Sequence, residues 1–153
     1  KLTSLPTSIG NLTSLERLDF WNNKLTSLPE SIGNLRSLER LDLRFNRLTS
    51  LPTSIGDLIN LKFLNINLNR LASLPESIGQ LTNLKGLSLP GNYILPWPTK
   101  IYQQLLNKTP RTQIYGSKAQ GIPVKKTIQY LQRKTRRIRG YQQIGHLEHE
   151  HQL

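Results

Sequence analysis

The sequence of 153 residues contains no cysteine and no methionine. The lack of cysteine excludes disulfide bonds and favours a reducing compartment, so we expect a cytoplasmic protein. Long apolar runs are also missing, because no stretch approaches the ~20 residues that a membrane-spanning helix needs. The sequence therefore predicts no membrane helix.

Acidic residues are scarce in the last part of the chain. Residues 94–153 contain eleven lysines and arginines against two acids, whereas residues 1–93 contain ten against seven. The C-terminal part therefore supplies most of the net charge of +12. All the histidines lie in residues 146–151. Because this tract has no cysteine and no predicted rigid element to fix ligand geometry, we predict no metal site.

The dominant feature is a repeat with a spacing of 23 residues. Its copies begin at Leu2, Leu25, Leu48 and Leu71, and a degenerate fifth copy begins at Ile94. Such a period indicates a solenoid, in which each unit packs only on its neighbours. We predict an α/β solenoid with short parallel strands on the concave face and an irregular or 3-10 convex side. A helix and a strand should close it, and a basic tail should follow.

The second half of each copy reads LxxLxLxxNxL, as in residues 38–48. Its alternating leucines indicate a strand with one buried face. An asparagine recurs where the chain leaves each strand, at Asn23, Asn46, Asn69 and Asn92. A buried amide both donates and accepts hydrogen bonds, so we interpret these residues as a structural ladder that satisfies the turn.

The first half of each copy contains Leu-Pro and then Ile-Gly. Proline should deny the convex side a regular ladder partner. The glycines should allow a positive φ where a short turn closes. They recur in every full copy, at Gly10, Gly33, Gly56 and Gly79.

The full pattern, LxxLPxxIGxLxxLxxLxLxxNx, resembles the 23-residue leucine-rich repeat of the Ras-suppressor, LAP and Roco scaffolds and of many bacterial leucine-rich repeat proteins. The resemblance covers residues 1–95. It implies the solenoid fold, and by analogy it suggests small GTPases or their regulators as partners. The residues that carry it form the core, so binding depends on the residues between them.

Three segments are expected: four repeats in residues 1–93, a degenerate repeat and cap in 94–117, and a basic tail in 118–153. Lys1 occupies the slot after a ladder asparagine, and no polar cap precedes it. We therefore expect the C-terminal piece of a longer protein, with a partly bare first edge formed by Leu2, Leu5, Ile9 and Leu12. In the cap, Pro98 should begin a helix, and residues 112–115 should form a strand. The apolar face of that helix should comprise Trp97, Ile101, Leu105 and Leu106, with Trp97 as a lid over the core.

Outward-facing strand positions decide the function of such a solenoid. Large aromatic side chains and arginines gather there in the first repeats, and these residue types carry most interface energy. We predict a partner-binding site at Arg17, Asp19, Trp21, Arg40, Asp42, Arg44, Phe45 and Phe63. Phe45 lies one residue past the strand alternation.

An enzyme is not expected, although Asp19 and Asp42 should lie one strand apart, as paired acid and base groups would. Nearby arginines explain the same carboxylates as a surface ion-pair lattice, and no histidine, cysteine or activated serine is adjacent. We predict no catalytic residues, no cofactor and no small-molecule substrate.

The tail has three competing interpretations. It is a solvated basic segment, a basic helix that binds an anionic membrane or nucleic acid, or an amphipathic helix that binds a partner protein. The residues for anion binding would be Lys125, Lys126, Arg133, Lys134, Arg136, Arg137 and Arg139.

The sequence thus predicts a protein-interaction scaffold that binds through its concave face. One alternative is anion binding by the tail, with the repeats as a spacer. Another is regulation of an enzyme or GTPase domain upstream of Lys1.

Overall fold

The computed structural model describes residues 1–94, 99–108 and 113–115. All of them belong to one compact unit, Lys1–Ser117. The described part of this unit contains five short strands: β1 (Arg17–Asp19), β2 (Arg40–Asp42), β3 (Phe63–Asn65), β4 (Gly86–Ser88) and β5 (Gln113–Tyr115). The helical elements are the 3-10 helices η1 (Thr7–Asn11), η2 (Glu30–Asn34), η3 (Thr53–Asp57) and η4 (Glu76–Gln80), and the α-helix α1 (Thr99–Lys108).

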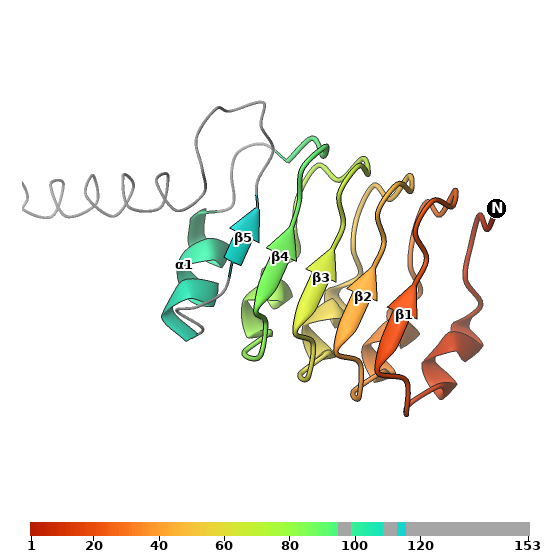
Figure 1. Cartoon of the computed structure of the whole chain (residues 1–153), viewed down its shortest axis with the longest axis horizontal. Coiled ribbons are helices and arrows are strands. Elements are labelled where there is room, and N and C mark those ends of the chain that lie inside the picture. Colours follow the sequence, from red (N-terminus) through yellow and green to blue (C-terminus); the bar gives the residue numbers. More distant parts are fainter. Residues whose placement is uncertain (95–98, 109–112, 116–153) are drawn as a thin grey trace, which may run out of the picture. The chain divides into compact units, whose positions relative to one another are not determined.

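The strands form one parallel sheet in the order β1-β2-β3-β4-β5 (Figure 1). The register is that of the repeat, since Leu18, Leu41, Leu64, Leu87 and Ile114 are successive partners across the sheet. The 3-10 helices lie in a row behind the sheet (Figure 1). The predicted α/β solenoid, with parallel strands on one side and 3-10 turns on the other, is therefore confirmed.

The core lies between these two layers. Leucine and isoleucine slots of the second repeat, such as Leu41 and Leu43, are fully buried. The equivalent Leu18 and Phe20 of the first repeat are only partly buried, because among the described residues no repeat stacks on the outer side of β1. At the same edge Leu2 and Leu12 are about half exposed, at 49% and 48%. Burial of each leucine column thus depends on neighbours on both sides.

α1 packs beside η4 at the other end of the stack. Ile101 and Leu105 are buried, as predicted. Tyr102 occupies the slot that is glycine in the earlier repeats, and its side chain is also buried. The helix therefore covers the last leucine column with an aromatic ring where the other repeats have only backbone. The predicted lid residue Trp97, and the side chain of Leu106, lie outside the described residues.

The repeated glycines were predicted for the wrong reason. Gly91 is the glycine with a positive φ among the described residues, whereas the Ile-Gly glycines adopt negative φ. A Cβ built on Gly33 would lie 2.6 Å from the backbone oxygen of Ser54 and 2.7 Å from the Ser54 Cβ. Gly10 and Gly56 meet the serine of the next repeat in the same way. Glycine is needed because successive 3-10 helices approach too closely for a side chain.

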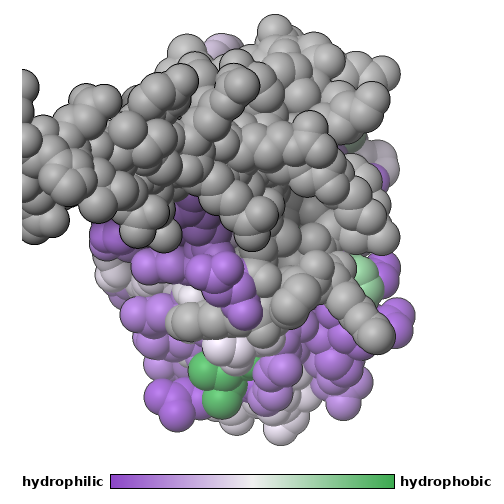
Figure 2. Space-filling model, turned by 90° about the vertical axis from the view of Figure 1, so that its left-hand side faces the viewer, coloured by the Kyte–Doolittle hydropathy of each residue, from purple (hydrophilic) through white to green (hydrophobic). Residues whose placement is uncertain are grey.

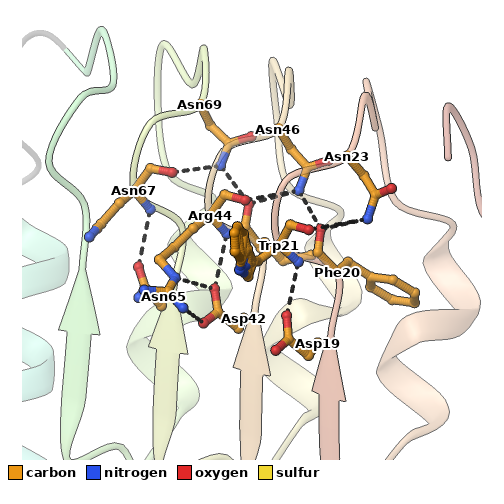
Figure 3. A network of polar contacts seen from close by, with 11 residues as sticks. Asp19, Phe20, Trp21, Asn23, Asp42, Arg44, Asn46, Asn65, Asn67 and Asn69 are labelled. Atoms are coloured by element: carbon orange, nitrogen blue, oxygen red, sulfur yellow. Dashed lines mark hydrogen bonds and ion pairs between the residues drawn. The ribbon is translucent and has the colours of Figure 1, made fainter. Parts of the chain in front are cut away.

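The asparagine ladder is confirmed and links each repeat to the one before it (Figure 3). Asn46 Oδ1 accepts a hydrogen bond from the backbone N–H of Leu25 at 3.0 Å. Its Nδ2 donates to the carbonyl of Phe20 at 2.8 Å and to that of Leu43 at 3.1 Å. Asn69 and Asn92 repeat this arrangement. Each amide therefore satisfies backbone groups of two repeats at once.

Asn46→Ala should lower the free energy of unfolding by about 1–3 kcal/mol, because buried backbone groups lose their partners. Asn23→Ala is the matched control. Asn23 Nδ2 donates only within its own repeat, to Phe20 and Trp21, so its loss should be smaller. Urea unfolding of both variants checks this, and equal losses would show that the bond between repeats contributes nothing.

Gly33→Ala should also destabilise the chain, by about 1–3 kcal/mol, because two backbones must separate to admit the methyl group. Ser27→Ala, at an exposed position of the same repeat, should change stability by no more than about 0.5 kcal/mol. Thermal unfolding is the measurement. A Gly33→Ala variant as stable as the control would contradict the close approach.

Candidate functional site

The outward face of the sheet is the candidate site. In β2 the exposed Arg40 and the half-buried Asp42 flank the buried Leu41, which is the alternation that the sequence predicts. Register pairing aligns Arg17, Arg40, Phe63 and Gly86 in one column across four strands. Asp19, Asp42, Asn65 and Ser88 form the next column. The predicted site residues of the strands therefore share one surface.

Trp21, Arg44 and Phe45 form a cluster where β1 and β2 end. The Trp21 and Phe45 ring centroids are 6.2 Å apart at an interplanar angle of 52°. The guanidinium carbon of Arg44 lies 5.9 Å from the Trp21 ring centroid. Trp21 and Phe45 remain 46% and 50% exposed. Phe45 lies past the strand alternation, but its ring packs on the same cluster.

Asp42 holds Arg44 in place (Figure 3). Arg44 Nη2 lies 2.9 Å from Asp42 Oδ2, and Arg44 Nε donates to Asp42 Oδ1 at 3.0 Å. A two-point contact of this kind fixes the plane of the guanidinium group. The arginine is thus preorganised between a carboxylate and an aromatic ring.

The carboxylates have a second role at the strand ends. Asp19 Oδ1 accepts a hydrogen bond from the backbone N–H of Trp21 at 2.9 Å, and Asp42 Oδ1 accepts one from that of Arg44 at 3.1 Å. Asn65 forms the same bond to the N–H of Asn67 at 3.3 Å. Asn65 accepts this bond with an uncharged amide oxygen, so the slot needs a side-chain oxygen as acceptor but not a negative charge. These aspartates therefore shape the strand exit.

The predicted ion-pair lattice is wrong for most of the face. Among the described residues, Arg44–Asp42 is the only ion pair on this surface. Arg40 instead stacks on Phe63, with its guanidinium carbon 5.0 Å from the ring centroid. Arg17 is exposed and forms no ion pair within the described part of the chain. Aromatic rings in the neighbouring strands compete for the arginines, and solvent screens the remaining charges.

The residue before each ladder asparagine adopts the left-handed backbone conformation. Its φ is 59° at Asn22, 54° at Phe45, 53° at Leu68 and 76° at Gly91. Asparagine and glycine tolerate this region, whereas phenylalanine and leucine rarely adopt it. Leu68 is 47% exposed beside Phe45 in the next repeat. Leu68 was not among the predicted site residues, although the asparagine and glycine in the same slot indicated the turn.

A shallow hollow of about 200 Å³ lies over β2, β3 and β4. It exists where the side chains of the column become small, at Gly86 and Ser88. The polar and aromatic residues that line it are Arg40, Asp42, Phe63, Asn65 and Ser88. The face is therefore bulky at β1 and β2 and hollowed toward β4.

Four of the eight exposed large apolar side chains of the described residues lie on or beside this face. They are Trp21, Phe45, Phe63 and Leu68. Seen from the end where α1 and β5 lie, the visible described surface is mostly hydrophilic, with small hydrophobic areas (Figure 2). The presence of four such side chains on one face favours the sheet side as the contact surface.

The anion-binding site expected in the tail stays a prediction. The seven basic residues assigned to anion binding lie in 118–153, outside the described residues. Within the described ranges, no group of three or more histidine, aspartate or glutamate residues is arranged to hold a metal ion. No helix in the same ranges has the length and apolar character to cross a bilayer.

Two family models match the chain. One is described as leucine rich repeats (2 copies) and matches residues 13–58, and the other is described as leucine rich repeat and matches residues 36–94. Together they span more than half of the chain. No curated protein was found to match it.

Solved structures show the same fold. A leucine-rich repeat protein of Leptospira interrogans is 38% identical, with a TM-score of 0.65, and an internalin of Listeria monocytogenes is 25% identical, with a TM-score of 0.62. Each match covers 73% of this chain, which spans only 28% and 31% of those two proteins. The repeat, the ladder and these matches agree: the chain is a leucine-rich repeat protein.

Proposed function

We propose that this chain is an interaction module that binds a partner protein through the outward face of its sheet, at the first two repeats. Leucine-rich repeat domains generally mediate protein–protein interactions and are typically not enzymes. The observation that carries the proposal is the cluster of Trp21, Arg44 and Phe45. Two half-exposed aromatic rings beside a preorganised arginine are the arrangement found at the centres of protein interfaces.

The composition of the face supports this position. Interface cores are enriched in aromatic residues and arginine, and the rim is polar. Arg17, Arg40, Asp19 and Asp42 would form that rim, and Phe63 would extend the apolar contact. At β4 the matching positions are Gly86, Ser88 and Pro90, which offer little to anchor. The footprint therefore centres on β1 and β2.

The backbone of Phe45 gives independent support. A phenylalanine with φ of 54° costs on the order of 1–3 kcal/mol relative to a relaxed conformation. Such strain persists where a side chain is needed in one place, and it concentrates at binding sites. Here it holds an aromatic ring half exposed against Trp21.

The remaining expectations stay predictions. Small GTPases and their regulators are suggested by resemblance to scaffold families, and the cytoplasmic location is suggested by the lack of cysteine. Binding of the 118–153 tail to an anionic membrane or to nucleic acid is the alternative function. None of these follows from the geometry of the sheet.

Position 45 should prefer asparagine to alanine. Phe45→Asn should be more stable than Phe45→Ala by about 0.5–1 kcal/mol, because asparagine tolerates a positive φ. Phe63 is the control, since it is exposed but lies within β3, where asparagine has no such advantage. Urea unfolding of the four variants measures the two differences. The same ranking at both positions would show that Phe45 is not strained.

Trp21→Ala and Arg44→Ala should each weaken partner binding by about 1–3 kcal/mol and leave thermal stability nearly unchanged. Proteins retained by the immobilised chain but not by Trp21→Ala would be identified, purified and titrated against each variant. Lys85→Ala, an exposed cation outside the cluster, is the control. The proposal fails if Trp21→Ala lowers stability by several kcal/mol and binds the purified partner as well as the unchanged chain does.

A further inference from the structure

A row of exposed cations occupies the slot that follows the ladder asparagines, except after Asn92, where this slot holds the exposed Tyr93. It consists of Lys1, Lys24, Arg47 and Arg70, which occupy the same slot of successive repeats. The backbone N–H of Lys24 donates to the carbonyl of Leu2 at 2.7 Å, and those of Arg47 and Arg70 donate to Leu25 and Leu48 at 2.9 Å. These bonds place the slots side by side, at about the 4.8 Å spacing of neighbouring strands. We call these four residues the cation row.

The cation row has no acidic partner within the described chain. The ion pairs there are Arg44–Asp42, Lys62–Glu39 and Lys100–Glu76, and none includes a member of the row. Lys1 donates its Nζ hydrogen to the amide oxygen of Asn22, a neutral group. Like charges at strand spacing repel one another unless an anion lies between them. The row is therefore complementary to a series of carboxylates.

An apolar row runs beside it. Phe45 and Leu68 lie two residues before Arg47 and Arg70, and both are half exposed with a positive φ. Leu68 is fixed against the next repeat, since a Cβ on Gly91 would lie 2.6 Å from Leu68 Cδ2. Trp21 extends this row toward the first repeat through its contact with Phe45. The strand exits thus present one apolar row and one cationic row in parallel.

We propose that the strand exits bind an extended, acidic segment of a partner protein that crosses the repeats and alternates acidic with apolar side chains. This rests on the proposed function and names the chemistry of the partner. Successive side chains of an extended chain point to opposite sides. One side would therefore place carboxylates on the cation row while the other packs on Phe45 and Leu68. Four cations at strand spacing span about 14 Å, which about five extended residues can follow.

The same cations could meet the phosphates of a nucleic acid, but the surroundings favour a peptide. Residues 1–93 carry ten basic and seven acidic residues, so the repeats lack the broad positive field of a nucleic-acid surface. Asp19 also lies beside Trp21, where it would repel a phosphate backbone. Leu68 offers no ring on which a base could stack.

The test titrates the full-length chain with a capped peptide of about eight residues, alternating glutamate and leucine. The amide NMR shifts of Phe45, Arg47, Leu68 and Arg70 report binding at the row, apart from any binding by the basic tail. A peptide with glutamine in place of glutamate, and an oligothymidylate of similar length, are the comparison probes. Only the acidic peptide should shift these amides strongly, and added salt should weaken its binding.

The double variant Arg47→Gln/Arg70→Gln should weaken binding of the acidic peptide about tenfold, and Arg47→Lys/Arg70→Lys should restore most of it. Arg36→Gln/Lys85→Gln removes two exposed cations outside the row and should change the affinity less than about twofold. Unchanged circular dichroism would verify that the variants fold.

The inference is overturned if the glutamine peptide binds equally well, if only residues 118–153 shift, or if the control variant loses as much affinity. Tighter binding of the oligothymidylate at the same amides would also overturn it, in favour of nucleic acid. The proposed function is tested separately, by Trp21→Ala. If Trp21→Ala weakens the binding of a purified partner but Arg47→Gln/Arg70→Gln does not, the proposed interaction face is supported and its specificity for acidic segments is contradicted.

Discussion

The side-chain amide of each ladder asparagine is the interaction on which the rest of this solenoid depends. Asn46 accepts from the N–H of Leu25 and donates to Phe20 and Leu43, so it joins the end of its own strand to the preceding repeat. Without it, backbone groups at a buried turn would lose their partners. The amide also sets where the chain leaves the sheet, and therefore where each following residue is displayed.

Because the repeats stack uniformly, a few differences in their outward-facing residues are enough to form a distinct binding surface. The core slots hardly vary, so the strands keep one register and equivalent side chains align in columns. The first two repeats differ at Trp21 and Arg44, and in the structure these two residues pack together. A surface of this kind can change its specificity without changing its core, because the residues that fold it and the residues that bind are separate sets.

At the strand exits, the exposure of apolar side chains lowers the stability of the backbone. The left-handed conformation there suits Asn22 and Gly91, yet the middle repeats place Phe45 and Leu68 in it. The stacked repeats hold these residues in place, since backbone hydrogen bonds lie on both sides of the exit: the N–H of Phe45 donates to the carbonyl of Asn67, and that of Arg47 to the carbonyl of Leu25. The scaffold can therefore maintain two apolar side chains in an exposed and strained position.

The repeat pattern alone was enough to predict the strands, the buried leucine columns, the ladder and the outward columns, because period and alternation depend only on local spacing. It was not enough for the glycines, whose purpose is a contact between repeats: Gly33 meets Ser54 of the next 3-10 helix. Nor could it predict which arginine contacts which partner, since Arg40 stacks on Phe63 of the neighbouring strand and forms no ion pair with a carboxylate of the described residues. Leu68 could be assigned to the exposed apolar row only from its φ and its exposure in the structure. The sequence by itself determined which residues are stacked and which are displayed. Tertiary structure decided which displayed residues meet, because those contacts join residues about one repeat apart in the chain whose side-chain directions depend on the turn between them.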